Sequence, residues 1–562
     1  MTEILSRGCY LMISFRTVVI LLLLLSTFVD PVLSFQRRRR QPTPEKTELV
    51  KFSAPEIFTY EELLKLAEDP IPQNLKAKLD KLLSTPFVSN EAYFQGAKPI
   101  QPNLPQLGSS LRIVMWNIER GLNLDDIIAV FTNKEAFLKK IDTNKVKPES
   151  SEYRKVLEEI EVLQSADLLI LNELDWGIKR SKYKEVVKEL GQATNMNWAY
   201  GVEFIEIDPI NLGTETFEEV LPEDREAMKA AIAVDKSLYK GLHGTAILSR
   251  YPIREAKLQP LKTKAFDWYK EQKAKVSLPE KGKRQVSEKI FLEKIQREVR
   301  RGGRTLLTVT LDVDELPEKK LTVVAPHLEN NCKPACRQQQ MDEILGYIKN
   351  VTGPVVMAGD LNTTFRDGTP TSFKREFTRR LGSSEFWTGQ GIKYVTGVGL
   401  VFDVLKGGIS FIKNHNDPTV KHVPVVAPNP EEKLFKKLED FRFADNYRFD
   451  FRGDKDRSFN ELEGTLANSN ERASKGFAVT FEVERTVGPV GKLKLDWIFV
   501  KPYITDPRNS EDYYRFAPHF ARTMEEINYS VADRMSDHNP ISVDLPFKEP
   551  DVEKLKNTQA RR

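Results

Sequence analysis

A layered α/β fold is predicted for this chain by a helix-then-strand pattern that occurs twice and by the polar residues that end its strands. The pattern comprises helix 153–163 before strand 168–171 and helix 338–348 before strand 354–358. Each helix has its apolar residues on one face, and each strand is an unbroken apolar run. Helices and strands that alternate in this way indicate helices packed on sheets.

Further apolar strands follow one another without an intervening helix, which favours mixed or antiparallel sheets. They are predicted at 111–116, 198–205, 244–249, 304–313, 320–325, 478–483, 493–500 and 540–545. A chain of 562 residues with 40% hydrophobic and 30% charged residues can bury a large core around such sheets. The formal net charge of +4 is too small to indicate a polyanionic partner by itself.

The N-terminus has the pattern of an export signal. Arg16 precedes the apolar run 18–25, which is shorter than a membrane span of about 20 residues, and a cleavage site is expected after Ser34. We therefore expect a signal peptide over 1–34 and a secreted or periplasmic protein. The alternative is an uncleaved signal anchor, which the basic cluster 37–40 would suit if it stayed in the cytoplasm.

Composition divides the rest of the chain into three parts. We expect a linker and helical N-terminal arm at 35–108, a main domain at 109–547 and a charged tail at 548–562. Within the arm, the apolar spacing over 60–83 predicts a helix. The four prolines in 86–107 favour a covering arm or linker there.

Two stretches of the main domain are predicted to be insertions, 265–303 and 366–490. The first is rich in Lys and Arg, and it fits either a solvated helix with salt bridges or a basic arm that faces phosphates. The second interleaves aromatic residues with arginines, as in Phe441-Arg442-Phe443. This composition fits a local hydrophobic cluster or a surface that stacks bases or sugars.

Cys332 and Cys336 are the thiols that remain after the signal segment. Their close spacing allows one local disulfide in an oxidising compartment, and a free pair is the alternative. Zinc is not expected, because a structural zinc site usually has four ligands and no second Cys or His pair lies nearby in the sequence.

Residues suited to phosphoester chemistry recur where the predicted strands end. Asp360 and Asn362 follow the strand at 354–358 and point the same way, because side chains alternate along an extended segment. The complete ordered set comprises Asn117, Glu119, Glu173, His327, Asp360, Asn362, Asp496, Asp537 and His538.

This set resembles that of the endonuclease/exonuclease/phosphatase superfamily, and the resemblance covers about residues 111–545 apart from the two insertions. It implies a deoxyribonuclease I-like, four-layer α/β sandwich, in which two mixed β-sheets pack together between outer helices. It also implies an enzyme that hydrolyses phosphoesters where the strand ends converge. The stretch 243–250 resembles the family's central strand and is interpreted as structural, with His243 as a weaker phosphate-side candidate.

A phosphodiester is anionic, so its hydrolysis needs an activated water and a cation that offsets the charge gained in the transition state. The resemblance implies Mg²⁺, with Mn²⁺ as an alternative, held by Glu173, Glu119, Asn117 and Asp537. For Glu119 a solvated side chain is an equal alternative. For Asn117 the alternative is a turn that ends the strand.

The catalytic residues that the resemblance implies are His327, Asp360, Asn362, Asp496 and His538. Asp360 and Asn362 match the pair that orients or deprotonates the attacking water. Asp496 orients and charges His538, which matches the hydrogen-bond donor to the scissile phosphate. His327 matches a phosphate-binding histidine or general acid. Substrate binding is assigned to Asn117, Asn362 and His327.

The expected function is that of an exported, divalent-metal-dependent endonuclease or phosphodiesterase that acts on nucleic acid through attack of metal-activated water on phosphorus. A lipid-headgroup phosphatase or a sphingomyelinase-like phospholipase is the alternative on the same fold, and a non-catalytic binding module is the third hypothesis. The sequence indicates no stable protein partner. Membrane anchoring is expected only if the signal is uncleaved.

Overall fold

The computed structural model describes residues 48–215, 226, 229–230, 232–270, 298–363, 418–419, 429, 431–460, 462–474, 476–487, 490–504, 514–552 and 555–556. The chain divides into two units, Met1–Glu48 and Leu49–Arg562, and the described helices and strands belong to the second. The predicted signal peptide, residues 271–297 and 366–417 of the predicted insertions, and the last residues of the tail lie outside the described ranges.

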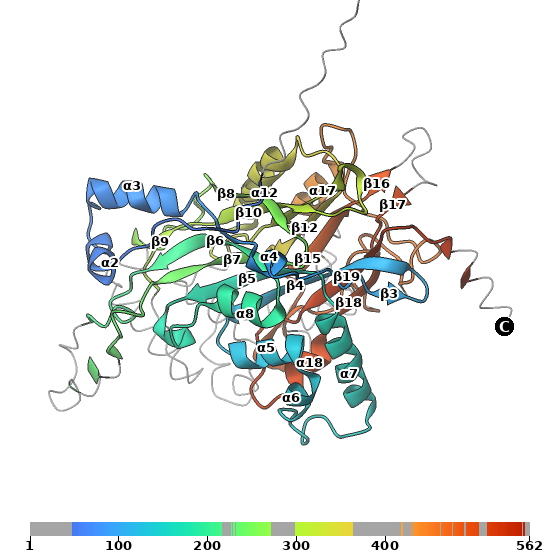
Figure 1. Ribbon diagram of the computed structural model, residues 1–562, viewed down its shortest axis with the longest axis horizontal. Helices are drawn as coiled ribbons and strands as arrows, with labels where there is room; N and C mark the ends of the chain where they lie inside the picture. Colours follow the sequence, from blue (N-terminus) through green and yellow to red (C-terminus); the bar gives the residue numbers. More distant parts are fainter. Residues whose placement is uncertain are drawn as a thin grey trace, which may run out of the picture. The chain divides into compact units, whose positions relative to one another are not determined.

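A ten-stranded sheet contains the first predicted helix-then-strand unit (Figure 1). Its strands lie in the order β1-β2-β6-β7-β5-β4-β19-β18, with β3 paired to β4 and β9 to β6. β4 and β5 are parallel and the other pairs are antiparallel, so the sheet is mixed. The bounds are β1 Phe52–Ser53, β2 Phe87–Ser89, β3 Asn103–Leu104, β4 Gly108–Arg120, β5 Leu168–Trp176, β6 Asn197–Glu206, β7 Leu242–Ser249, β9 Arg300–Gly302, β18 His519–Thr523 and β19 Ile541–Pro546.

A five-stranded sheet contains the second unit, in the order β15-β12-β11-β10-β8. Its bounds are β8 Ile253–Pro260, β10 Thr305–Asp312, β11 Lys320–Ala325, β12 Val355–Asp360 and β15 Asp496–Lys501. β11 and β12 are parallel and β15 runs antiparallel to β12, so this sheet is mixed too. Two small antiparallel pairs lie apart from it: β13 Phe481–Val487 with β14 Val490–Leu493, and β16 Tyr503–Ile504 with β17 Tyr514–Arg515.

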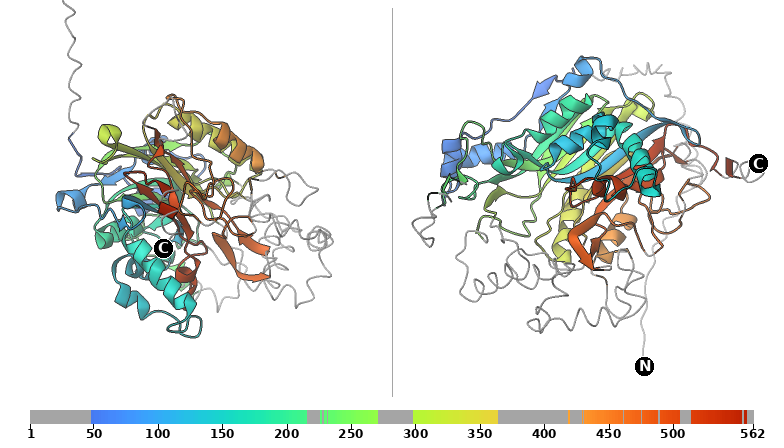
Figure 2. Two further views of the ribbon diagram at one scale, coloured as in Figure 1. Left: turned by 90° about the vertical axis from the view of Figure 1, so that its right-hand side faces the viewer. Right: turned by 90° about the horizontal axis from the view of Figure 1, so that it is seen from below.

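The two sheets pack face to face, and helices cover their outer faces (Figures 1 and 2). Alternate residues of β4 show this: Ile113 and Met115 join a core between the sheets, whereas Val114 and Trp116 join the core beneath the helices. Helices on the ten-stranded sheet are α2 Tyr60–Leu66, α3 Gln73–Leu82, α4 Glu91–Phe94, α5 Leu124–Thr132, α6 Lys134–Leu138, α7 Ser151–Gln164, α8 Val186–Thr194 and α18 Glu525–Tyr529. The five-stranded sheet is covered by α12 Pro334–Ile348 and α17 Glu432–Asp440. The predicted four-layer α/β sandwich is confirmed.

Several local predictions differ from the structure. The helix predicted over 60–83 is two helices, because Pro70 and Pro72 interrupt it. Within 86–107, which we expected to be an arm or linker, β2 pairs with β6 and extends the large sheet. β8 and β18 were not predicted, because partly or fully exposed polar residues interrupt them and leave no continuous apolar run.

The described part of the predicted insertions packs against the domain. Phe443 and Phe449 lie in the core beneath α17, so the aromatic residues around them form a hydrophobic cluster, as one of the two interpretations proposed. Cys332 and Cys336 are free thiols, so the local disulfide is not formed. None of the helices in the described ranges combines the length and hydropathy of a membrane span.

Candidate active site

Side-chain alternation brings predicted residues from both sheets to one place. Met115 on β4 and Ala358 on β12 are buried between the sheets. Asn117 and Asp360, each two residues further along, continue those faces. Asp496 lies opposite Asp360 because β12 and β15 pair at this register. Nδ2 of Asn117 donates to Oδ2 of Asp360 at 3.2 Å, so a hydrogen bond joins the two sheets at the site.

Irregular backbone at the ends of β4 and β5 places Glu119 and Glu173 near Asn117. The register of β4 and β5 shifts between Asn117 and Arg120, and Glu119 and Glu173 have positive φ values of 44° and 57°. Such bulges redirect side chains and are common beside active sites. Oε1 of Glu173 accepts a hydrogen bond from Nδ2 of Asn117 at 3.3 Å. Without the shift, strict alternation would turn Glu173 toward the helices.

Gly359 lets the loop after β11 approach Asp360. A Cβ atom at Gly359 would lie 1.9 Å from the carbonyl oxygen of Pro326, so a larger residue would displace backbone. The N–H of Leu328 donates to the carbonyl of Asp360 at 3.0 Å. His327, between these two contacts, is thereby held beside Asp360.

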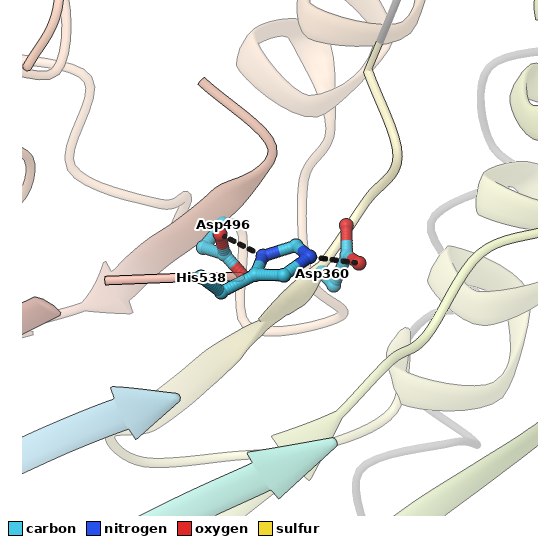
Figure 3. A group of neighbouring side chains, drawn as sticks. All are labelled: Asp360, Asp496 and His538. Atoms are coloured by element: carbon cyan, nitrogen blue, oxygen red, sulfur yellow. Dashed lines mark hydrogen bonds and ion pairs between the residues drawn. The ribbon is translucent and has the colours of Figure 1, made fainter. Parts of the chain in front are cut away.

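His538 and Asp496 form a buried pair (Figure 3). Nδ1 of His538 lies 2.7 Å from Oδ2 of Asp496, and Nε2 faces Asp360 on the other side of the ring. Burial alone would lower the pKa of His538, but the carboxylate of Asp496 raises it well above its usual range. The ring therefore carries a positive charge that suits a phosphate.

His327 has a carboxylate partner of its own, Glu203. Oε2 of Glu203 lies 3.3 Å from Nδ1 of His327 and accepts from Nη1 of Arg304 at 2.7 Å. The same Arg304 nitrogen lies 2.7 Å from Nδ1 of His327. Burial would raise the pKa of Glu203, but His327 and Arg304 hold it below its usual range. Arg304 and Glu203 together fix the orientation of the His327 ring.

Asp360 lies between the two histidines. Its Oδ2 is 3.8 Å from Nε2 of His327 and 3.8 Å from Nε2 of His538, while its Oδ1 accepts from the N–H of Asn362 at 2.8 Å. Burial raises the pKa of Asp360 to about 6, and the charge of Asp496 adds to this against the opposing effect of the histidines. A buried carboxyl that titrates near neutral pH beside two histidines can accept a proton from water. The side chain of Asn362 is engaged beside His327, because its Nδ2 donates to the carbonyl of Leu328 at 3.0 Å.

Hydrogen bonds link the four predicted metal ligands in pairs. Besides the Asn117–Glu173 contact, Oε2 of Glu119 accepts from the N–H of Asp537 at 3.1 Å. Burial and the negative charges of Asp537 and Glu173 raise the pKa of Glu119 to about 7. The amide of Asn117 is already engaged, because its Nδ2 donates to Glu173 and its Oδ1 accepts from the N–H of Glu119 at 3.2 Å. A hard divalent cation such as Mg²⁺ would offset the charge of the three carboxylates.

Asp360, Asp496 and His538 are the one group of three or more Asp, Glu, His or Cys residues in the described ranges whose ligand atoms all lie within 4.8 Å of one another. This group fits a cation less well, because Oδ2 of Asp496 and Nδ1 of His538 are already joined by a hydrogen bond. The raised pKa of His538 also favours the protonated ring, which cannot bind a metal through either nitrogen.

His243 does not join Asp360. Its Nδ1 lies 2.8 Å from Oδ1 of Asp175, and Oδ2 of the same carboxylate accepts from Nε of Arg180 at 2.7 Å. His243 nevertheless acts on the site at a distance. Burial alone would raise the pKa of Glu173, but His327, His243 and Arg120 lower it to about 2. Glu173 is therefore ionised and able to hold a cation at neutral pH.

A family model matches most of this domain. The model of the endonuclease/exonuclease/phosphatase family matches residues 116–538, which run from the end of β4 to His538. The chain belongs to this family. Its members hydrolyse phosphoesters, so the protein is an esterase of that kind. The predicted family membership is confirmed. No curated protein matches the sequence.

Solved structures of endonuclease/exonuclease/phosphatase enzymes are similar to the chain. One, from Beutenbergia cavernae DSM 12333, is 15% identical with a TM-score of 0.30, and the match covers 78% of this chain and 71% of that one. An AP endonuclease from Archaeoglobus fulgidus is 13% identical with a TM-score of 0.33, over 77% of this chain and 99% of that one. TDP2 from D. rerio, in complex with a single-strand DNA product, is 15% identical with a TM-score of 0.28, over 78% of this chain and 98% of that one.

Two residues of the site were not assigned by the sequence, Glu203 and Arg304. Glu203 is a bulge residue, since the register of β6 and β7 shifts between Val202 and Phe204. A glutamate inside an otherwise apolar strand was the signal that could have marked it. Arg304 ends the basic turn 301–304, but its contact with His327 depends on the packing of two strands.

A chain of hydrogen bonds links Glu203 to Asp360. Oε1 of Glu203 accepts from Oγ1 of Thr245 at 2.5 Å, and that hydroxyl accepts from Nδ2 of Asn172 at 3.0 Å. Oδ1 of Asn172 in turn accepts from the N–H of Asp360 at 2.8 Å. All of these residues are buried, so this series of hydrogen bonds fixes the distance between Glu203, which contacts His327, and Asp360.

Proposed function

We propose that this protein is an exported, divalent-metal-dependent endonuclease or phosphodiesterase that acts on nucleic acid. The position of Asp360 supports the proposal most directly, because its Oδ2 is 3.8 Å from Nε2 of both His327 and His538. Each histidine has a carboxylate partner at Nδ1. A base flanked by two histidines provides both the proton acceptor and the charge that attack on an anionic phosphate requires.

The residues then divide the work as follows. Asp360 accepts the proton of the attacking water, and the N–H of Asn362 orients this carboxylate. His538, charged through Asp496, donates a hydrogen bond to a phosphate oxygen. His327, on the opposite side of Asp360, stabilises the charge that develops on the phosphate or protonates the leaving oxygen.

Glu173, Glu119, Asn117 and Asp537 would hold the divalent cation. When bound, the cation offsets the charge that the phosphate gains in the transition state. Mg²⁺ is the proposed ion, because the donors are carboxylate and amide oxygens and the group includes no sulfur ligand.

Phe481 supports a nucleic acid substrate. Its ring is half-buried and lies 4.9 Å from the ring of His538, measured between centroids. An aromatic surface beside a phosphate-binding histidine can stack a base or a sugar of the scissile strand. Export is supported by the N-terminal signal pattern alone.

A substrate panel tests this proposal. Purified protein would be incubated with supercoiled plasmid, single-stranded DNA, RNA, inositol phosphates, and vesicles that contain sphingomyelin or phosphoinositides, each with Mg²⁺ or with EDTA. We expect cleavage of nucleic acid that EDTA abolishes. Release of phosphate or phosphocholine from the vesicles, with nucleic acid intact, would replace the proposal with the lipid-headgroup alternative. Hydrolysis of none of them would favour a binding module.

A further inference from the structure

β15, which carries Asp496, has one open side. It ends the five-stranded sheet, and β12 is its one partner among the strands that the structure describes. Polar side chains from 470–480 take the place of a neighbouring strand. Oδ1 of Asn470 accepts from the N–H of Ile498 at 3.1 Å, and its Nδ2 donates to the carbonyl of Ile498 at 2.8 Å. Buried strand edges need such partners for their backbone groups.

Thr480 binds the open edge of β15 at the end of the strand that carries Asp496. Its Oγ1 accepts hydrogen bonds from the N–H of Leu495 at 2.9 Å and the N–H of Asp496 at 3.1 Å. The side chain is fully buried. The Thr480 hydroxyl therefore binds the backbone of Asp496, the residue whose carboxylate is hydrogen-bonded to His538.

Thr480 also contacts the loop of the partner histidine. Its carbonyl accepts from the N–H of Asn539 at 2.7 Å. Phe481, the next residue, forms a β-bridge to His538, and the ring of Phe481 packs on the imidazole. Thr480 is thus hydrogen-bonded to the backbone on both sides of the Asp496–His538 pair.

The carboxylate of Asp496 depends on this backbone support. Its Oδ2 is engaged by His538, while Oδ1 has no hydrogen-bond partner in the part of the chain that the structure describes. No other side chain there orients the carboxylate, so its position follows from that of its backbone. A catalytic geometry that relies on one hydrogen bond is sensitive to small shifts of the strand.

We propose that Thr480 is a positioning residue for the reaction: its hydroxyl and carbonyl hold Asp496 and the loop of His538 so that Oδ2 of the carboxylate stays within hydrogen-bond distance of Nδ1 of the imidazole. This inference rests on the proposed function, in which that pair acts on the phosphate. Thr480 itself touches neither substrate nor the reacting atoms.

Thr480→Val and Thr480→Ser test the role of the hydroxyl at nearly constant volume. We expect Thr480→Val to lower kcat by about 10- to 100-fold with little change in KM, because the substrate-binding surface is intact. Thr480→Ser, which retains the acceptor, should restore most of kcat. Thr194→Val is the matched control, since this buried hydroxyl bonds to the Leu190 carbonyl in α8, away from the site. Wild-type kcat in Thr480→Val would overturn the inference.

A double-mutant cycle with Asp496→Asn separates positioning from loss of stability. If Thr480 acts through Asp496, adding Thr480→Val to Asp496→Asn should lower kcat by less than twofold, although the melting temperature falls in both backgrounds. The same fold-loss in both backgrounds would overturn the inference and leave the proposed function in place. An Asp496→Asn protein with wild-type kcat would instead overturn the proposed role of the pair, and the inference with it.

Discussion

Nδ1 of His538 lies 2.7 Å from Oδ2 of Asp496, although the two residues are 42 positions apart in the chain. Both side chains are buried, and the pair lies where β15 meets the loop before β19. The contact keeps the imidazole charged inside a buried site, where burial alone would favour the neutral form.

The first prediction concerns this contact. Asp496→Asn should lower kcat by about 10- to 100-fold, because an amide keeps the size of the side chain but cannot hold the positive charge on His538. Steady-state kinetics with the substrate that the panel finds to be hydrolysed fastest measure this change in kcat. Asp544→Asn is the control, since Asp544 is a buried carboxylate paired with Arg112 and Arg522 away from the site. That variant should lose stability and retain kcat; equal kcat losses in the two variants would refute a special role for Asp496.

The second prediction concerns the metal. Glu173→Gln should weaken Mg²⁺ binding by about 10- to 100-fold, because a neutral amide replaces a carboxylate ligand. Titration calorimetry with Mg²⁺ and with Mn²⁺ measures the affinity, and exposed Glu161→Gln in α7 is the control. Unchanged affinity in Glu173→Gln, with affinity lost in Asp496→Asn, would instead assign the cation to the Asp360, Asp496 and His538 group.

The third prediction concerns the backbone contact at Gly359. Gly359→Ala should lower the free energy of unfolding by about 1–3 kcal/mol, because the added Cβ would meet the Pro326 carbonyl at 1.9 Å. It should also reduce kcat, since the displaced loop carries His327. Urea unfolding and steady-state kinetics measure the two effects. Gly346→Ala in α12 has open space around the new Cβ and should stabilise the protein or leave it unchanged. Similar effects of the two substitutions would disprove the close-packing explanation.

The fourth prediction concerns the pH dependence of stability at Asp167. Burial raises the pKa of this carboxyl to about 6 from 3.8, although the N–H groups of Ile100 and Gln101 donate to it. Because the folded-state pKa is the higher one, Asp167 stabilises the fold fully below pH 3.8 and loses that contribution as the pH rises through about 6.

The free energy of unfolding of the wild type, minus that of Asp167→Asn, should therefore fall by up to about 3 kcal/mol between pH 4 and pH 7. Urea unfolding at several pH values measures this difference, and the constant cost of the amide cancels from its slope. A difference that rises with pH would mean that the two backbone donors outweigh burial.

The fold and the strand-end residues could be predicted because both are local properties of the sequence. Asp360 follows an unbroken apolar run, and such a run identifies both a buried strand and the polar residues at its end. The break of the N-terminal helix at Pro72 was visible too, but the apolar spacing on both sides concealed it.

The partners of the site residues could not be predicted in this way. Glu203 reaches His327 because alternation from Ala199 places it on the face of β6 between the two sheets, and Thr480 reaches Asp496 because β15 is an edge strand. Both relations depend on register and on strand order, which are set by contacts between distant residues. The sequence shows that Glu203 and Thr480 are present but not which distant residues they contact in the fold.

The central claim is that phosphoester hydrolysis occurs where Asp360 lies between His327 and His538. Mg²⁺-dependent nicking of supercoiled plasmid by the wild type, His538→Ala and His519→Ala tests it most directly. His519 is the matched control, because it is a buried histidine paired with Glu549 outside the site. The account predicts that nicking by His538→Ala falls by about 10²- to 10⁴-fold while His519→Ala stays active. Nicking that survives in His538→Ala at the wild-type rate would contradict the account.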